Sequence, residues 1–273
     1  MSDTDTTIQA ACIQMCSGEH VADNLEKAAT LLQQAVKQQA RLVLLPETFA
    51  CVTQNTEKRR IATDMMPQIV SWLQDQARVH QIWLIGGSIL ALSDQHEKLH
   101  NRSLMISPNG EIIARYNKMH LFDIDLAKES WHESAHVQAG EKPVSIDIET
   151  GWKLGLSICY DLRFPELYRT YSANACNILS IPAAFIVSTG KAHWQALLQA
   201  RAIENQCYVL AAGQSGTHED GRNTWGHSMI IDAWGNILQQ LDAGEGVITA
   251  PLSLANLNRV RQHLPALQHR RLL

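Results

Sequence analysis

The chain has 273 residues, a formal net charge of −4 and 45% hydrophobic residues. That hydrophobic share is enough to fill one large core. The slightly negative charge gives no reason to expect nucleic acid or an anionic membrane surface as a partner. No run of about 18 apolar residues is present, so we expect no membrane span. The polar N-terminal sequence MSDTDTT is unlike a secretory signal peptide.

Six cysteines are spread along the chain without the spacing of a disulfide framework. This usage is typical of a reducing compartment, and we expect a cytoplasmic protein without disulfides. Neither the pair Cys12 and Cys16 nor the scattered histidines form a convincing ligand set, so we expect no metal. Cys51 follows a glutamate segment and is expected near the site described below.

Hydrophobic periodicity predicts strands and helices that alternate along the chain, which indicates one α/β domain over residues 1–273. A long polar connection is expected at 123–142, and connections of that length are often functional. The predicted strands are 8–14, 42–45, 83–89, 102–107, 112–116, 153–159, 177–181, 208–213, 227–232 and 247–250. The predicted helices are 24–39, part of 57–65, 68–80, 165–174 and 193–205.

A glutamate stands directly at the end of the apolar strand 42–45. The segment is RLVLLPETF, in which Pro46 ends the strand and Glu47 follows it. In an α/β sheet, reactive groups gather at this carboxyl edge. A partly desolvated carboxylate there can act as a general base, whereas a solvated one would only cap the next turn.

A lysine follows the strand 112–116 in the segment IIARYNKMHLF. The dipeptide Asn109-Gly110 before this strand is a strong hairpin signal. Lys118 has apolar neighbours, so its side chain either extends to solvent or has an electrostatic role. Close to a cysteine, such a cation would favour the thiolate and stabilise an oxyanion.

A cysteine lies where an apolar strand breaks into a charged turn, in LGLSICYDLRFPEL. Cys159 ends the strand, and Pro165 begins a helix soon afterwards. At such an elbow the side chain is held rigidly and the following backbone N–H groups point towards the group it attacks. The alternative is an ordinary buried cysteine, which is a common state for free thiols.

The strings LPETF, YNKMHLFD and ICYDLRFPELYR, in this order, resemble the nitrilase superfamily of carbon–nitrogen hydrolases from Thr7 to about Arg271. The resemblance implies an αββα four-layer sandwich that pairs into a homodimer. It also implies amide hydrolysis through a thioester, without a cofactor. Glu47 is then the base, Cys159 the nucleophile, and Lys118 with the backbone N–H of Tyr160 the oxyanion site. The segment WHESAHVQAG assigns an assisting role to Glu133, with Glu129 as its competitor.

The same resemblance implies a small amide substrate with a carboxylate. The residues beside the nucleophile, Tyr160, Arg163 and Phe164, are candidates for substrate contact. Arg163 offers a bidentate site for the carboxylate, or else a structural ion pair with Asp161 or Glu166. Residues 182–184 follow the next strand and are expected to form a pocket wall, with Pro182 and Ala183 as the candidates.

The segments GRNTWGHSMIIDAWG and RQHLPALQHRRL resemble the Nit branch, and within it the amidases that act on deaminated glutathione. An ω-amidase acting on 2-oxoglutaramate is the alternative within the same class. A catalytically silent Nit-type binding scaffold is the alternative of another class, although all three motif residues are present. A papain-like protease is disfavoured, because the flanks of Cys159 do not match and the α/β pattern predicts mostly parallel strands.

Overall fold

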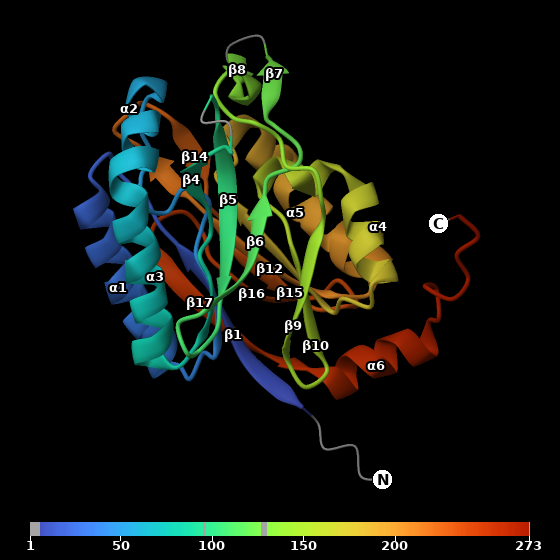
Figure 1. Ribbon diagram of the computed structural model, residues 1–273. Coiled ribbons are helices and arrows are strands. Elements are labelled where there is room, and N and C mark those ends of the chain that lie inside the picture. The colour runs from blue at the N-terminus through green and yellow to red at the C-terminus, as the bar shows by residue number, and fades with distance from the viewer. Residues whose placement is uncertain (1–5, 95–96, 127–129, 273) are drawn as a thin grey trace.

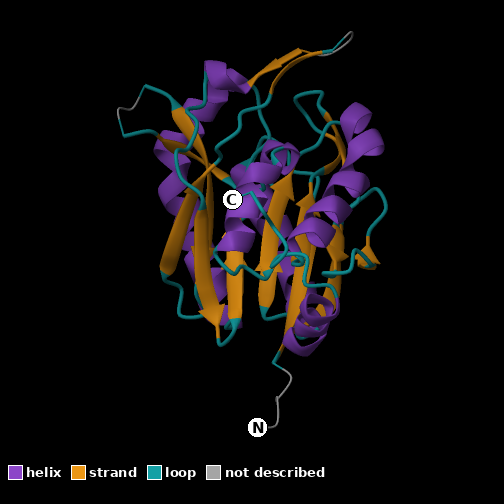
Figure 2. Ribbon diagram, turned by 90° about the vertical axis from the view of Figure 1, so that its right-hand side faces the viewer, coloured by secondary structure: helices purple, strands orange, loops and turns teal. Residues whose placement is uncertain are grey.

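The computed structural model describes residues 6–94, 97–126 and 130–272. Two β-sheets lie face to face in the middle, and helices cover the outer face of each sheet (Figure 1, Figure 2). The predicted αββα sandwich of the α/β class is therefore confirmed. Among the described residues, no helix is both long enough and apolar enough to cross a membrane.

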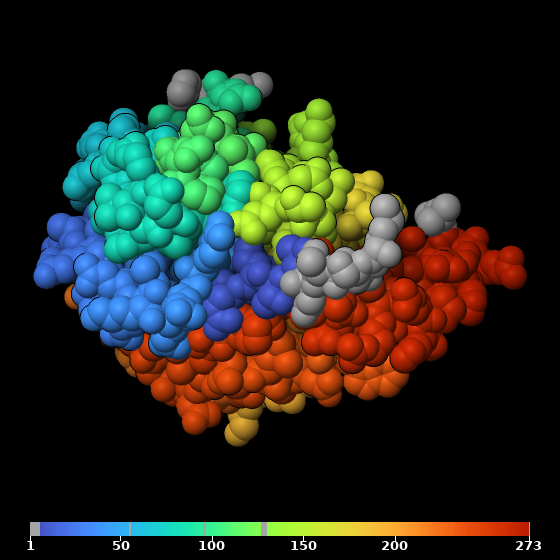
Figure 3. Space-filling model, turned by 90° about the horizontal axis from the view of Figure 1, so that it is seen from below, coloured from blue at the N-terminus to red at the C-terminus, as the bar shows by residue number. Residues whose placement is uncertain are grey.

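The first sheet has seven strands, and both ends of the chain contribute to it. Its order is β17 (Gly246–Ser253), β1 (Thr7–Gln14), β2 (Leu42–Leu44), β3 (Trp83–Ile85) and β5 (Leu99–Ile106), with β4 (Ile89–Leu92) and β6 (Ile112–Asn117) each paired to β5. The long antiparallel pairing of β1 with β17 places the N-terminal strand against the C-terminal segment (Figure 3).

The second sheet has six strands, and two short hairpins lie outside the two main sheets. The order of the six is β16 (Ile237–Gln240), β15 (Met229–Ile231), β12 (Tyr208–Gly213), β11 (Ile178–Ala183), β10 (Trp152–Leu156) and β9 (Val144–Glu149). The hairpins are β7 (Asp123–Asp125) with β8 (Ser130–His132), and β13 (Ser215–Thr217) with β14 (Asn223–Trp225). The first of them occupies part of the predicted polar connection.

Strand direction differs from the prediction of mostly parallel strands. Among the described strands of the two main sheets, the parallel pairs are those within β1, β2 and β3 and within β10, β11 and β12. The other strand pairs of these sheets run antiparallel. Short connections, such as those joining β4 to β5 and β5 to β6, require this direction. The predicted strand 83–89 is in fact β3 and the start of β4, separated by Gly86–Ser88. Gly87 has a φ of +53° and lies so close to Pro46 that a side chain would collide with its carbonyl.

The helices divide between the two outer layers. On the first sheet lie α1 (Val21–Lys37), α2 (Asn55–Arg60), the π-helical turn η1 (Ile61–Met65) and α3 (Met66–His80). The second sheet is covered by α4 (Pro165–Ala173) and α5 (Val187–Asn205). The 3₁₀ turns η2 (Glu133–Ala135) and η3 (Cys159–Arg163) lie near the upper edge of the sandwich. Helix α6 (Leu254–His263) extends outward at the lower end (Figure 1). Helix α5 begins at Val187, before the predicted residue 193, although its first turns hold weak helix formers, and Gly190 in this part is buried against Trp225.

Strand β1 is buried on both faces, which explains why the central strands show no polar alternation. Ala10 and Cys12 belong to the core between the two sheets, whereas Ala11 and Ile13 pack towards α1 and α3. Strands that are covered on both faces have near-continuous apolar sequences. Because it is packed on both faces, the strand is held firmly, and so is the start of the polar loop that follows it at the upper edge of the sheet.

We predict that Gly155→Ala destabilises the protein. Gly155 lies in β10, and an added Cβ would come within 2.7 Å of the Tyr171 ring on α4. Overpacking of this kind typically costs about 1–3 kcal/mol. Urea unfolding should show the loss. An unchanged free energy of unfolding would mean that the Tyr171 ring moves aside without cost.

Candidate active site

The structure brings Glu47, Lys118 and Cys159 together at the upper edge of the sandwich. Glu47 follows β2, Lys118 follows β6, and Cys159 follows β10 as the first residue of η3. All three line one cavity of about 140 Å³, and each is at least nine-tenths buried. The three strand ends that the sequence singled out therefore form one site, and Cys51 lines it as well.

Lys118 is held between two carboxylates. Its Nζ lies 2.7 Å from Oε2 of Glu133 and 3.2 Å from Oε1 of Glu47. Burial disfavours the ammonium charge, but the charges of Glu133 and Glu47 outweigh burial and raise the pKa of Lys118 well above its usual value. For Glu133, burial raises the pKa, but Lys118 prevails and the carboxyl is held below its ordinary pKa. Lys118 and Glu133 therefore form an ion pair of ammonium and carboxylate, and Glu47 lies on the other side of the ammonium.

Asn101 joins the two carboxylates from below. Its Nδ2 donates to Oε1 of Glu47 at 2.8 Å and to Oε1 of Glu133 at 3.3 Å. Its Oδ1 is buried and has no hydrogen-bond partner among the described residues, although Asn101 lines the cavity. This role could not be predicted from the sequence, because an asparagine next to a predicted strand has no distinguishing pattern before the fold is known.

Backbone donors complete the orientation of both carboxylates. The N–H of Ala184 donates to Oε2 of Glu47 at 2.8 Å. The N–H of Phe122 donates to Oε2 of Glu133 at 2.7 Å, which anchors the β7–β8 hairpin to the site. Glu133 thus takes the position expected of the assisting glutamate, whereas Glu129 lies outside the described residues.

Cys159 occupies a strained elbow. Its φ of +51° lies in the left-handed region, which is unfavourable for a residue with a side chain and is tolerated mainly where surrounding structure enforces it. Burial, and after it the charge of Glu47, raise the pKa of the Cys159 thiol well above the ordinary value, while Lys118 acts in the opposite direction. The cation thus has the predicted effect, but the thiol of the free protein is neutral and needs a base before it can attack.

Asp161 ties the lysine segment to the cysteine segment. This fully buried carboxylate accepts hydrogen bonds from Tyr116 Oη at 2.7 Å, His120 N at 3.0 Å and Ile158 N at 2.8 Å. His120 Nδ1 lies 2.7 Å from the same carboxylate. Because these donors come from both sides of the site, Asp161 fixes Lys118 relative to Cys159.

The candidate substrate residues divide into two groups. Tyr160 lines the cavity, whereas Phe164 lies behind it, stacked on His120 at 3.7 Å between ring centroids. Pro182 and Ala183 belong to β11 and are buried, and the wall after this strand is formed by Ala184 and Phe185 instead.

Arg163 does not line the cavity either. Its guanidinium lies over the rings of Tyr160 and Phe185, at 5.7 and 5.4 Å, and its Nη1 is 3.2 Å from Nδ1 of His193. Among the described residues, Arg163 pairs with neither Asp161 nor Glu166, the carboxylates that the sequence offered. It supports the aromatic wall from behind.

Three further cavity residues were not predicted from the sequence. Lys58 comes from α2, Trp131 from β8, and Arg222 from the turn between β13 and β14. They are far apart in the chain and lie in segments without a recognisable motif, so only the folded chain brings them together.

Comparison with known proteins agrees with this geometry. The model of the carbon–nitrogen hydrolase family matches residues 9–262. A Synechocystis protein named deaminated glutathione amidase is 46% identical over 96% of this chain and 97% of its own length. A Dictyostelium discoideum protein of the same name is 40% identical over 95% and 92%. The crystal structure of Saccharomyces cerevisiae Nit3, a member of branch 10 of the nitrilase superfamily, has a TM-score of 0.88, 32% identity and 97% coverage of both chains. The predicted resemblance is confirmed.

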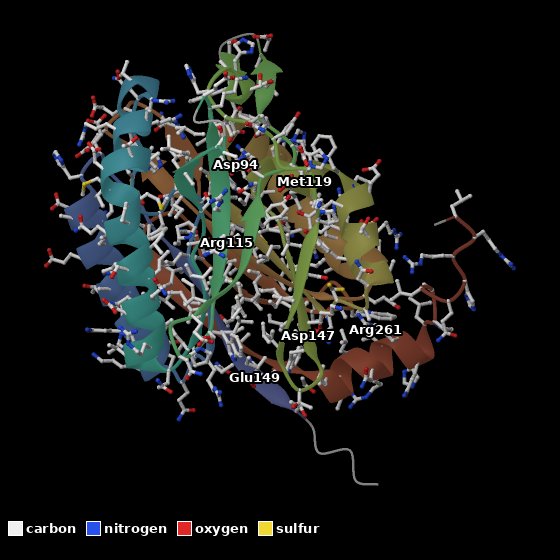
Figure 4. All side chains as sticks on the ribbon, in the orientation of Figure 1. Asp94, Arg115, Met119, Asp147, Glu149 and Arg261 are labelled. Atoms are coloured by element: carbon white, nitrogen blue, oxygen red, sulfur yellow. The ribbon has the colours of Figure 1, made fainter. Side chains whose placement is uncertain are left out.

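We predict that Asp161→Asn destabilises the protein by about 1–3 kcal/mol, because an amide cannot accept from donors on both of its sides and leaves buried N–H groups unpaired. Urea unfolding checks this. The matched control is Asp147→Asn, an exposed position on β9 well below the site (Figure 4). Equal stability of the two variants would contradict the linking role of Asp161.

We also predict that Glu47→Gln lowers the pKa of Cys159, because it removes the negative charge that opposes the thiolate while Lys118 remains. The pH midpoint for alkylation of Cys159 by iodoacetamide, followed by mass spectrometry, should shift downward. Glu149→Gln at the lower end of β9 is the control (Figure 4). An upward shift would mean that Lys118 no longer acts on the thiol.

Proposed function

Because the chain belongs to the carbon–nitrogen hydrolase family and is an amidase, we propose that it hydrolyses deaminated glutathione to 2-oxoglutarate and cysteinylglycine. The observation that carries this proposal is the similarity, over nearly the full length, to relatives that bear the name of this activity. The gathering of Glu47, Lys118 and Cys159 in one cavity supplies the chemistry that amide hydrolysis requires.

In the first step, Glu47 takes the proton of the Cys159 thiol. The sulfur attacks the amide carbon, a C–S bond forms, and the carbonyl electron pair moves to the oxygen. Lys118 Nζ and the backbone N–H of Tyr160 stabilise this oxyanion. Preformed donors of this kind are worth about 10²–10³ in rate each, because they need no reorganisation when the charge develops.

The tetrahedral intermediate then collapses with cleavage of the C–N bond. The amine leaves with the proton that Glu47 had taken, and the acyl group stays on Cys159 as a thioester. Water enters where the amine was, and Glu47 removes a proton from it. Attack on the thioester breaks the C–S bond, releases the acid and returns a proton to the sulfur. Two moderate steps replace one difficult step, and no cofactor takes part.

Glu133 has an assisting role in this scheme. It pairs with Lys118 and accepts from the N–H of Phe122, so it keeps the ammonium charged and aimed while Glu47 gains and loses a proton. If Glu47 were the only carboxylate beside Lys118, each protonation of Glu47 would weaken the ion pair that holds the ammonium at the oxyanion site.

We further propose a cytoplasmic homodimer, as the family resemblance implies. Two large apolar side chains support a covered face: Ile203 on α5 is 49% exposed and Trp234 is 57% exposed. Gly235, which follows Trp234 in the chain, packs directly against Ile203. Exposed apolar groups that gather on one part of a surface are typical of contact surfaces.

The competing substrate is 2-oxoglutaramate, which has the same acyl half joined to ammonia. We predict that the protein hydrolyses deaminated glutathione with the higher kcat/KM, and that Cys159→Ala abolishes release of 2-oxoglutarate from both. A coupled assay for 2-oxoglutarate measures this.

A preference for 2-oxoglutaramate would replace the proposed substrate and leave the thioester mechanism standing. Turnover that survives in Cys159→Ala would overturn the mechanism. Absence of turnover with both substrates in the wild type, with Cys159 still reactive towards iodoacetamide, would refute the substrate and favour the binding-scaffold alternative.

A further inference from the structure

We infer that Arg222 and Lys58, together with Trp131, form the part of the cavity that binds the carboxylate of the substrate's acyl half. This inference rests on the proposed function and names the groups that select the substrate. The three side chains line the same cavity as Glu47, Lys118 and Cys159. The polar atoms of these three side chains can only donate hydrogen bonds, and Asp220, which pairs with Arg222, is not among the residues that line the cavity.

Arg222 is held rigidly before any ligand arrives. Its Nη2 lies 3.2 Å from Oδ2 of Asp220, whose side chain is only 7% exposed. The face of the guanidinium lies 5.0 Å from the centroid of the Trp131 ring. Asp220 and the Trp131 ring already hold the guanidinium in place. Arg222 therefore loses little conformational entropy when an anion binds to its remaining N–H donors.

Two buried donors at this position have no partner among the described residues. They are Nε of Arg222 and Nε1 of Trp131. An unpaired buried N–H is unfavourable, so such groups usually bind a ligand or an ordered water molecule. Because both residues line the cavity and both groups only donate, the ligand atoms that suit them are acceptors, and a carboxylate supplies two.

Lys58 adds a second positive charge from the opposite element, α2. Burial, and after it the charge of Arg222, lower the pKa of Lys58, while Glu133, Asp220 and Glu47 raise it. The two cations are therefore close enough to repel each other in a poorly solvated place. A bound carboxylate relieves this repulsion and gains from both charges.

The mechanism decides which half of the substrate meets this site. The acyl half stays attached to Cys159 while the amine leaves and water takes its place, so the leaving half must face the opening. The cavity volume of about 140 Å³ is below the range of about 300–1,000 Å³ typical for sites of whole drug-sized ligands, so we place only the acyl half inside it. The enclosed carboxylate is then the one beside the 2-oxo group.

Arg163, the arginine that the sequence suggested for this role, is less suitable. Its guanidinium is stacked over Tyr160 and Phe185, which stand between it and the cavity. Arg222 therefore replaces Arg163 as the proposed carboxylate ligand.

The test compares Arg222→Gln and Lys58→Gln with the wild type on three amides. Deaminated glutathione and 2-oxoglutaramate carry the acyl carboxylate, and pentanamide has the same acyl chain length without it. We expect kcat/KM to fall at least about 30-fold for both carboxylate substrates, because each variant leaves the bound carboxylate without one of its charged partners. For pentanamide the change should stay within about twofold. Arg115→Gln, which removes an exposed charge on β6, is the control (Figure 4).

Equal losses on all three amides would show a structural role and overturn the inference. A fall in kcat/KM with deaminated glutathione alone would mean that the site binds the carboxylate of the leaving half. That result would also contradict the inference. Unchanged values for all three amides would exclude any role in binding.

A second measurement does not depend on turnover. The product 2-oxoglutarate should protect Cys159 of the wild type from iodoacetamide, and Arg222→Gln should need at least about 30-fold more of it for the same protection. If the wild type hydrolyses neither carboxylate substrate yet shows this protection, the proposed function fails and the carboxylate site stands. If 2-oxoglutarate protects both proteins equally, the site fails whatever the substrate.

Discussion

The buried ammonium of Lys118 is the constraint on which the site depends. A cation removed from water is very costly unless charged partners surround it, and here Glu47 and Glu133 do so. Glu47 follows β2 in the first sheet, and Glu133 begins the turn η2 directly after the β7–β8 hairpin. The N–H of Ala184, after β11 of the second sheet, orients Glu47 in turn. The charge cluster therefore exists only when both sheets and the loops above them are in place.

The neutral state of the Cys159 thiol follows from the same cluster. A thiolate at Cys159 would place a negative charge in a buried space beside Glu47, and both burial and Glu47 disfavour it. The thiol keeps its proton until a carbonyl is there to take up the developing charge. This arrangement limits wasteful reactions of the sulfur, because the thiolate is the form that oxidation and electrophiles attack.

Much of the site could be predicted from the sequence, because its main residues directly follow apolar strands. Glu47, Lys118 and Cys159 each mark a strand end, and strand ends of an α/β sheet share an edge. Asn101, Lys58 and Arg222 could not be predicted, since a strand asparagine, a helix lysine and a turn arginine acquire a role only through tertiary contacts. Arg163 misled for the converse reason: it is next to the nucleophile in the chain, but its side chain lies behind the aromatic wall.

For the fold, periodicity predicted most central strands and three of the helices closely, but the layer count came from the family resemblance. The hydrophobic periodicity of a strand does not indicate whether it runs parallel or antiparallel to its neighbours. The antiparallel outer strands were therefore not predicted. The strand β9 and the helix α6 were also missed. Both are only partly buried, and α6 has few apolar residues on its packed side.

The pairing of β1 with β17 bears on how the chain is made. Strand β1 leaves the ribosome long before its antiparallel partner β17, because most of the described chain lies between the two strands. At about 5–20 residues per second, the interval is on the order of tens of seconds. Throughout synthesis the first sheet has an open edge at β1, with backbone groups able to pair with another nascent chain. The apolar sequence that makes β1 a good central strand thus requires shielding, by helix α1 or by a chaperone, until the C-terminal strand closes the sheet.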